Sequence, residues 1–421
     1  VRMVSIKFSK DAVGRSVRTS APMLDAALAV PLLHSVSRHR AAAIFSQDRY
    51  WLPDESKMEQ WIQKLKKQDL VQRLFAGDAS VWKEDEAHQK IIGNRLGWMN
   101  VHETMLGKLY QIDEIAQECK EAAFQDIVLL GMGGSSLAPE VMSLMLQKRT
   151  KPRFRILDTT DPEAILALES SLNLKETLFI VSSKSGGTIE TTSQYAYFYE
   201  RVAKLIREPN VIGSHFIAIT DKGSVLEKAA LAKQFRACFI NPSNIGGRYS
   251  ALSFFGLVPA ALMGIDVRAM LRGAAEFYRA SKAQLDYKKN QGVYLGLVLA
   301  YYAQQGKDKL TFLLSESLEP FGAWLEQLIA ESTGKEKKGI LPIAMEQPAS
   351  SPAVYGNDRF FAGLSLKQEA LYPQALTKAL VKSRFPMFRS EWRGGAEALG
   401  AEFLRWEIAT AIASAGIKVN P

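Results

Sequence analysis

Cysteine and histidine are scarce in this chain of 421 residues, which contains two cysteines and five histidines. Cys119 and Cys238 belong to no cluster with metal-ligand spacing, so the sequence predicts no metal site and no disulfide framework. So few cysteines indicate a reducing compartment, and we expect a cytoplasmic protein. No apolar run approaches the ~20 residues that cross a bilayer, so we expect no membrane partner.

Two nucleotide-binding signatures are also missing. Residues 130–139 (LGMGGSSLAP) follow an apolar run, but Ser136 stands where a dinucleotide fingerprint needs a third glycine. The Gly-Lys-Ser/Thr sequence that completes the phosphate loop of nucleotide hydrolases is absent. Two glycines followed by two hydroxyls suit a sugar or a sugar phosphate better, and a plain turn explains this loop about as well.

The formal net charge of +9 is compatible with two classes of partner. A nucleic-acid-binding protein would carry a basic-aromatic stripe or a recognition motif, and neither is found in the sequence. An enzyme of anionic substrates has a similar positive balance. We favour the enzyme and expect no nucleic acid.

Apolar runs alternate with amphipathic segments from residue 124 onward. This alternation predicts an α/β fold in which mostly parallel sheets carry helices on both faces. Predicted helices include an amphipathic one that begins near residue 54, a buried one over 251–270 at a domain junction and a closing one over 395–415. The predicted strands are residues 127–130, 154–157, 178–181, 216–219, 237–240, 310–314, 339–343 and 360–364.

The chain length favours two domains, because compact domains run roughly 100–200 residues. We expect an N-terminal arm and helix over residues 1–69, a first domain over 70–265 and a second over 266–421. Each domain is expected to be a doubly wound α/β/α sandwich, with phosphate binding in the first.

One strand-to-helix connection combines glycines, hydroxyls and a lysine. Residues 177–181 are typical of a buried strand, and a helical pattern resumes after residues 182–188 (SSKSGGT). Unpaired backbone N–H groups at a helix start attract anions, and glycines let the backbone approach closely. Lys184 adds a full counter-charge. We therefore favour a phosphate site over a Ser/Thr-capped loop without a ligand.

A second connection, residues 241–250 (NPSNIGGRYS), places an arginine after two glycines and just before a helix. Arg248 is positioned to hydrogen-bond an oxyanion. A structural arginine paired with a carboxylate explains this loop equally well.

Residues 246–253 (GGRYSALS) resemble the first signature of the glucose-6-phosphate isomerase family in pattern and placement. The glycine-rich loop with Ser135 and the loop at 183–188 stand upstream in that family's order. Residues 327–335 (QLIAESTGK) resemble the segment that carries its catalytic glutamate. The resemblance covers roughly residues 70 to 421. Four more stretches look like the isomerase half of bacterial transaldolase–isomerase fusions: 73–82, 94–98, 405–407 and 420–421.

The resemblance implies two sugar-isomerase (SIS) domains with the site between them, a hexose 6-phosphate substrate, no cofactor and a homodimer. The reaction would interconvert glucose 6-phosphate and fructose 6-phosphate through an enediolate, in glycolysis and gluconeogenesis. Glu331 would move the proton between C2 and C1, and Arg248 would stabilise the enediolate. The implied substrate-binding residues are Gly134, Ser135, Ser183, Lys184, Ser185, Thr188, Gly247 and Gln327.

Two glutamates have simpler interpretations beside the functional ones. Gln327 and Glu331 stand four residues apart and so share one helical face. Without the resemblance, Glu331 would be read as a solvated carboxylate beside lysines such as Lys335. Glu190 would orient Arg248 or a hydroxyl, and simple solvation is an equal alternative.

The chain departs from the family where a histidine of the partner subunit opens the sugar ring. The corresponding residues 354–360 (VYGNDRF) contain no histidine. Asp358 is the substitute that we predict, with a place in a surface turn as its alternative. All the histidines precede the Arg248 loop: His34, His39, His88, His102 and His215.

The second departure lies at the end of the sequence. The family continues past the Asn-Pro pair that matches Asn420 and Pro421 into a helix with an active-site lysine. We therefore expect a truncated second domain and less activity than in an intact relative. Two alternatives stay open, a regulator that senses sugar phosphates and an inactive fragment that still binds them; a nicotinamide dehydrogenase is a more distant third.

Overall fold

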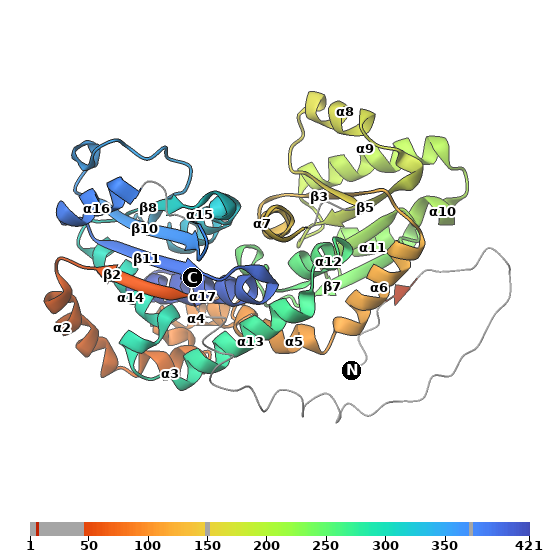
Figure 1. Ribbon diagram of the computed structural model, residues 1–421. Helices are drawn as coiled ribbons and strands as arrows, with labels where there is room; N and C mark the ends of the chain where they lie inside the picture. The colour runs from red at the N-terminus through yellow and green to blue at the C-terminus, as the bar shows by residue number, and fades with distance from the viewer. Residues whose placement is uncertain (1–5, 8–45, 148–151, 370–373) are drawn as a thin grey trace.

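The computed structural model describes residues 6–7, 46–147, 152–369 and 374–421. Most of the predicted N-terminal arm lies outside these residues. The described chain forms a six-stranded sheet and a five-stranded sheet (Figure 1). Both sheets are mostly parallel and carry helices, which confirms the predicted α/β class. The boundaries of the two domains stay a prediction.

The first sheet has the strand order β1-β7-β6-β5-β3-β4, in which only the edge pair of β1 and β7 is antiparallel among the described strands. Its central strands β3 and β5 are buried at every residue, as expected for parallel strands covered on both faces. The strands are β1 (Ile6–Lys7), β3 (Asp126–Gly131), β4 (Arg153–Leu157), β5 (Thr177–Ser182), β6 (Phe216–Asp221) and β7 (Ala237–Asn241). The helices that follow them are α7 (Leu137–Leu146), α8 (Pro162–Ser170), α9 (Ile189–Leu205), α10 (Pro209–Gly213) and α11 (Val225–Ala232).

The strand order reverses direction between β3 and β5. The chain passes from β3 outward to β4 on one side, and then crosses to β5, β6 and β7 on the other side. At such a switch point the connections that leave the carboxyl ends of neighbouring strands diverge, and a crevice opens between them. The loops that follow β3 and β5 therefore flank a natural ligand site.

The second sheet has the related order β2-β11-β10-β8-β9, with β2 antiparallel at one edge. Its strands are β2 (Gln47–Trp51), β8 (Lys309–Leu314), β9 (Leu341–Ile343), β10 (Arg359–Leu366) and β11 (Met387–Trp392). The nearby helices are α14 (Gln291–Gln304), α15 (Glu319–Thr333), α16 (Gln374–Lys382) and α17 (Gly395–Gly416).

All eight predicted strands exist, and the sequence-based prediction missed β1, β2 and β11. β2 lies in the segment predicted as an arm and a helix, and it is fastened to the second half through a buried ion pair. Arg405 of α17, which is fully buried, donates to Asp48 of β2 at 2.8 Å and also contacts Glu402 at 3.2 Å. This long-range pairing has no local signal in the sequence.

The predicted helix over residues 251–270 is wrong as a single element. The chain forms α12 (Phe254–Leu262), turns, and starts α13 (Val267–Ala283). Gly264 has a φ of +79°, a left-handed conformation that ends a helix, and Asp266 caps α13 by accepting from the N–H of Ala269. Within this turn Met263 and Ile265 are buried, so the apolar pattern continues, whereas Gly264 and Asp266 are exposed.

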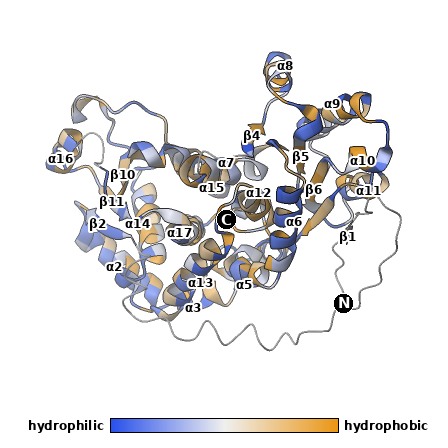
Figure 2. Ribbon diagram, turned by 45° about the vertical axis from the view of Figure 1, so that its right-hand side comes forward, coloured by the Kyte–Doolittle hydropathy of each residue, from blue (hydrophilic) through white to orange (hydrophobic). Residues whose placement is uncertain are grey.

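Helices fill the space between the two sheets, where Figures 1 and 2 show α12, α13 and α17. α17 is buried along almost its whole length and packs on α13 and α14. Glycines permit this approach, since a Cβ on Gly400 would lie 2.0 Å from the carbonyl oxygen of Met270. No helix in the described ranges is long and apolar enough to cross a membrane. The N-terminal helices are α2 (Glu55–Lys66), α3 (Leu70–Phe75), α4 (Glu86–Gly93), α5 (Val101–Leu106) and α6 (Leu109–Glu121).

Candidate active site

The loop after β5 is held in shape by its own hydroxyls. Ser183 Oγ accepts from the backbone N–H of Gly186 at 3.1 Å and hydrogen-bonds Thr188 Oγ1 at 3.0 Å. Gly186 has a φ of +69°, and a Cβ there would lie 2.8 Å from the backbone nitrogen of Leu226. Glycine is therefore required at this position. Ser185 is exposed, and α9 begins directly after Thr188.

Lys184 is not free in this loop. Its ammonium forms an ion pair with Asp221, at the end of β6, and donates to the carbonyl oxygen of Ser243 at 3.1 Å. Asp221 follows a predicted strand at the carboxyl edge of the sheet, so its position could have indicated a role in the site. The sequence predicted that the charge of Lys184 would bind an anionic ligand, but the carboxylate of Asp221 already balances this charge.

The loop after β3 meets the loop that carries Arg248. A Cβ on Gly134 would lie 2.3 Å from the carbonyl oxygen of Gly247, so the two backbones touch. Ser250 Oγ donates to the carbonyl oxygen of Gly134 at 3.2 Å, and Ser182 Oγ donates to that of Ser135 at 3.3 Å. These contacts join the connections after β3, β5 and β7 into one surface at the carboxyl edge of the first sheet.

A cavity of about 440 Å³ opens on this surface. It brings together most of the substrate-binding residues predicted from the first sheet. Its lining residues are Arg95, Met132, Gly134, Ser135, Lys184, Ser185, Thr188, Asp221 and Gly247.

Arg248 lies between the two halves of the molecule. Its Nε donates to Ser332 Oγ at 2.8 Å, and one terminal nitrogen lies 3.5 Å from Glu331 Oε2. The other terminal nitrogen donates to the carbonyl oxygen of Pro421 at 2.8 Å. Ser332 also donates to the hydroxyl of Tyr249 at 3.1 Å. Arg248 comes from the first sheet's last loop, whereas Glu331 and Ser332 come from α15, beside the second sheet.

Glu331 and Gln327 do share one face of α15. Gln327 Nε2 donates to Glu331 Oε1 at 3.0 Å, and the Glu331 side chain is 51% exposed. Gly133, with a φ of +53°, lies so close that a Cβ would stand 2.7 Å from Gln327 Nε2. The α15 side chains therefore reach the β3 loop as well as Arg248.

A second cavity, of about 360 Å³, lies beside Arg248. Lys335 is half-buried there and donates to the carbonyl oxygens of Ser332 at 3.0 Å and Asn420 at 2.7 Å. Burial, assisted by the charge of Arg248, lowers the pKa of Lys335 to about 8. The lining residues are Ile91, Arg95, Trp98, Lys184, Gly246, Gly247, Arg248, Tyr249, Lys335, Asn420 and Pro421.

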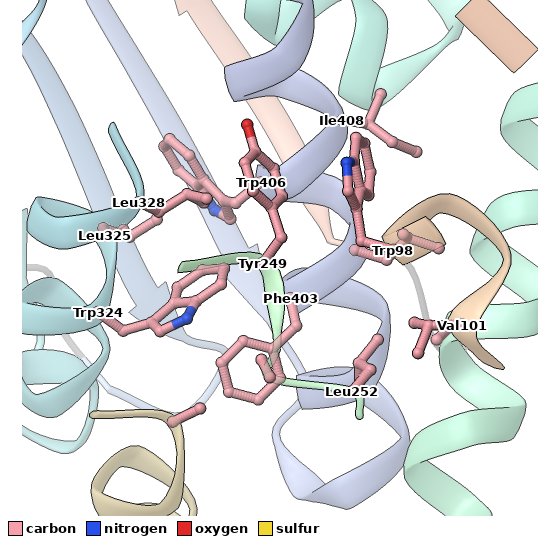
Figure 3. Close-up of a cluster of buried hydrophobic side chains, with 14 of the residues drawn as sticks. Trp98, Val101, Tyr249, Leu252, Trp324, Leu325, Leu328, Phe403, Trp406 and Ile408 are labelled. Carbon is pink, nitrogen blue, oxygen red and sulfur yellow. The ribbon is translucent and has the colours of Figure 1, made fainter. Parts of the chain in front are cut away.

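Aromatic packing fixes the Arg248 loop from behind. The ring of Tyr249 stacks on that of Trp98 with centroids 4.8 Å apart, and lies among Trp324, Phe403 and Trp406 (Figure 3). Burial raises the pKa of the Tyr249 hydroxyl to about 12, so this group stays protonated at neutral pH. No local signal in the sequence marks Trp98, because its stacking partner is about 150 residues away.

Two predicted residues do not join this cluster. Asp358 precedes β10 and forms an ion pair with Lys309 at 2.7 Å, which lowers its pKa. Asp358 lines neither of the two cavities. Glu190, in the first turn of α9, makes no hydrogen bond to Arg248 or to a loop hydroxyl among the described residues. The roles proposed for both residues stay predictions.

The part of the chain that carries this site matches a known protein family. The family model for phosphoglucose isomerase aligns with residues 103–357, which is more than half of the sequence. The chain belongs to the phosphoglucose isomerase family. The aligned residues include the three loops of the first sheet and α15, and so contain Arg248 and Glu331. The resemblance to the fusion proteins stays a prediction.

Curated relatives agree with the family. A glucose-6-phosphate isomerase from Trichormus variabilis is 37% identical over 264 residues, which cover 59% of this chain and 48% of the relative. One from Methanocaldococcus jannaschii is 32% identical over 222 residues, covering 52% and 53% of the two chains. The chain spans about half the length of the curated relatives it matches.

Solved structures confirm the fold of this family member. A hypothetical protein from Thermus thermophilus matches with a TM-score of 0.73 and 24% identity, over 89% of this chain and 95% of that one. A glucose-6-phosphate isomerase from Chlamydia trachomatis matches with a TM-score of 0.62 and 19% identity, over 83% and 74%.

Proposed function

We propose that this chain interconverts glucose 6-phosphate and fructose 6-phosphate, as a step of glycolysis and gluconeogenesis. The observation that carries the proposal is the contact between Arg248 and Glu331 across the two halves, beside the Ser135–Ser183 loops. An acid–base carboxylate, a fixed charge near the developing oxyanion and an anion site for the phosphate together suit the aldose–ketose isomerisation of a sugar phosphate.

Glu331 acts as the base in this proposal. Its carboxylate removes the proton from C2 of the open-chain aldose, and returns it to C1 as the double bond moves. One carboxylate serves both carbons because they are adjacent, and no redox cofactor takes part. Gln327 donates to Glu331 Oε1, which leaves Oε2 as the oxygen that faces Arg248. Positioned acid–base groups contribute roughly 10²–10⁴-fold to such reactions.

Arg248 stabilises the negative charge that develops on the sugar oxygens. A guanidinium remains charged at any working pH, and its planar donors suit an enediolate. Ser332 accepts from Nε at 2.8 Å and thereby fixes the plane of the group. The loops after β3 and β5 would hold the phosphate through Ser135, Ser183, Ser185 and Thr188, and so place the reacting end of the sugar under Glu331.

Three finer points belong to the same proposal. We propose that Asp358, supplied by the partner subunit of a homodimer, opens the sugar ring. Its place away from the two cavities of its own chain is compatible with a role in a partner's site. Cytoplasmic location is supported by the two cysteines, which are both free and buried. Sedimentation of the purified chain tests the homodimer.

Glu331→Gln tests the proposed function. The variant keeps the size of the side chain and removes the base, so turnover of fructose 6-phosphate should fall at least ~10²-fold. Binding of 6-phosphogluconate, measured by calorimetry, should persist. Glu319→Gln is the matched control, because Glu319 is an exposed glutamate at the opposite end of the same helix. Wild-type chain that binds 6-phosphogluconate without turnover would instead support a sugar-phosphate sensor or an inactive fragment.

A further inference from the structure

The cavity of 440 Å³ has three charged lining residues, Arg95, Lys184 and Asp221. Lys184 and Asp221 form an ion pair, so together they contribute no net charge to an incoming ligand. A phosphate dianion bound there needs a counter-charge from elsewhere. Arg95 is the remaining charged group in the lining.

Arg95 lines both cavities, the one bounded by the β3 and β5 loops and the one beside Arg248. Its side chain is exposed, and none of the hydrogen bonds or ion pairs among the described residues uses its guanidinium. All five guanidinium N–H donors are therefore available to a ligand. An arginine that faces a cavity without a protein partner is poised to bind an anion bidentately.

The backbone around Arg95 is fastened to the Arg248 loop. Leu96 forms a β-bridge with Ile245, and the N–H of Gly97 donates to the carbonyl oxygen of Asn244 at 3.0 Å. A Cβ on Gly97 would collide with the side chain of Asn244 at 2.3 Å. The next residue, Trp98, stacks on Tyr249. Arg95 is therefore held at a fixed place by its neighbours while its own side chain stays free.

We propose that Arg95 binds the phosphate group of the sugar phosphate and supplies the net positive charge of that subsite. This inference rests on the proposed function for the identity of the ligand. Lys184 then acts mainly in the architecture of the loop, where it ties β5 to Asp221 and to Ser243. Because Arg95 lines both cavities, it can hold a phosphate while the sugar extends toward Arg248.

Arg95→Gln tests this assignment with three probes: 6-phosphogluconate, inorganic phosphate and gluconate. Calorimetry of the variant should show roughly 10- to 100-fold weaker binding of the first two, the range expected for a lost charge-assisted contact, with gluconate unaffected. Arg95→Lys should restore part of the affinity, because the charge returns without the bidentate geometry. Unchanged phosphate affinity together with weaker gluconate binding would overturn the proposal and move Arg95 to the other end of the sugar.

Arg207→Gln is the matched control, since Arg207 is exposed, follows α9 and lines neither cavity. It should leave all three affinities unchanged, and equal losses in both variants would overturn the proposal in favour of a general charge effect. The urea midpoint of each variant should match that of the wild type.

Normal turnover and KM for fructose 6-phosphate in Arg95→Gln would contradict the role of Arg95 and leave the proposed function intact. If the wild-type chain lacks turnover but binds 6-phosphogluconate, and Arg95→Gln weakens that binding, the role of Arg95 stands and the proposed function is wrong.

Discussion

The two sheets share a related strand order and differ in the chemistry of the loops at their switch points. In the first sheet, β3 and β5 lead into loops of glycine, serine, threonine and lysine. In the second sheet the corresponding strands are β8 and β10, and their loops carry Glu316 and Glu369. Ser317 donates its hydroxyl to Glu369, so these loops bind each other. Similar topology thus leads to a crevice lined with hydroxyls in one half and to an acidic contact in the other.

This difference separates what the fold provides from what the loops provide. Both sheets have a switch point, but the side chains and backbone donors of the loops there decide what can bind. The second half contributes to the site through α15, whose Gln327, Glu331 and Ser332 reach across to the first half. We therefore expect substitutions in the loops of the first sheet to change catalysis, and substitutions around the second sheet, away from α15, to change stability.

Removal of a buried charge partner in the second half should have the largest effect. Asp48→Ala leaves Arg405 buried with one carboxylate fewer, and such losses cost about 3–5 kcal/mol. The urea midpoint should fall accordingly, while the KM of the folded fraction stays unchanged. Asp308→Ala is the control, because its pair with Lys309 is only partly buried and should be worth about 0–1 kcal/mol. An equal fall of the urea midpoint in both variants would show that the buried ion pair stabilises the fold no more than the partly buried one.

Substitution of Arg248, which contacts both halves of the molecule, should have the next largest effect, on the catalytic rate. Arg248→Met should lower kcat roughly 10²–10³-fold, the range seen when one charge-stabilising donor is lost. Steady-state assays of fructose 6-phosphate conversion measure the change. Arg389→Met removes an arginine of β11 that pairs with Glu391, and should leave kcat unchanged. Equal loss of turnover in both variants would contradict the expectation that the loops of the first sheet govern catalysis and the second sheet governs stability.

A smaller effect is expected in the phosphate loop. Ser183→Ala removes the acceptor of the Gly186 N–H and the partner of Thr188. One such hydrogen bond is worth about 1 kcal/mol, so KM should rise roughly fivefold with little change in kcat. Ser170→Ala, at the end of α8, removes a hydroxyl that binds the carbonyl oxygen of Ala167 and serves as control. A fall in kcat at constant KM would contradict a role in binding.

The smallest effect concerns the pH dependence at Lys335. Because its pKa is about 8, the lysine loses its charge between about pH 7 and pH 9. The charged groups that act on it are Arg248, Glu331 and Glu336. KM for the anionic substrate should rise a few-fold over this window, and Lys335→Arg should flatten the profile. A profile that is identical in both enzymes would exclude Lys335 as its cause.

The titration of Lys335 should also change the stability of the fold, which should rise with pH while substrate binding weakens. Its pKa is about 8 in the fold and 10.5 in the reference state, so the unfolded chain binds more protons between these values. Stability should therefore rise with pH across this window, and the cost of the buried charge is fully present below it. Urea midpoints of the wild type and Lys335→Met at about pH 7.5 and about pH 10 measure this contribution.

The sequence predicted what depends on local pattern. The parallel strands follow from short apolar runs, and the loops after β3, β5 and β7 from glycines and hydroxyls at strand ends. It missed β2 and β11, because edge strands and their neighbours mix charged and apolar residues, as in Gln47–Trp51. It also missed the Asp221 partner of Lys184 and the Ser332 contact of Arg248, since both depend on pairing over tens of residues.

The close contact of Gly134 with Gly247 limits how this site can change during evolution. No side chain fits at Gly134 or Gly186 without moving backbone, so these positions cannot be used to reshape the cavity. Gly187 and Gly247 stand in open space, where a Cβ meets no atom within 4 Å. A lineage that shifts toward a smaller or differently substituted sugar would therefore vary these open glycines and Ser185 first, and would keep the touching backbones as they are.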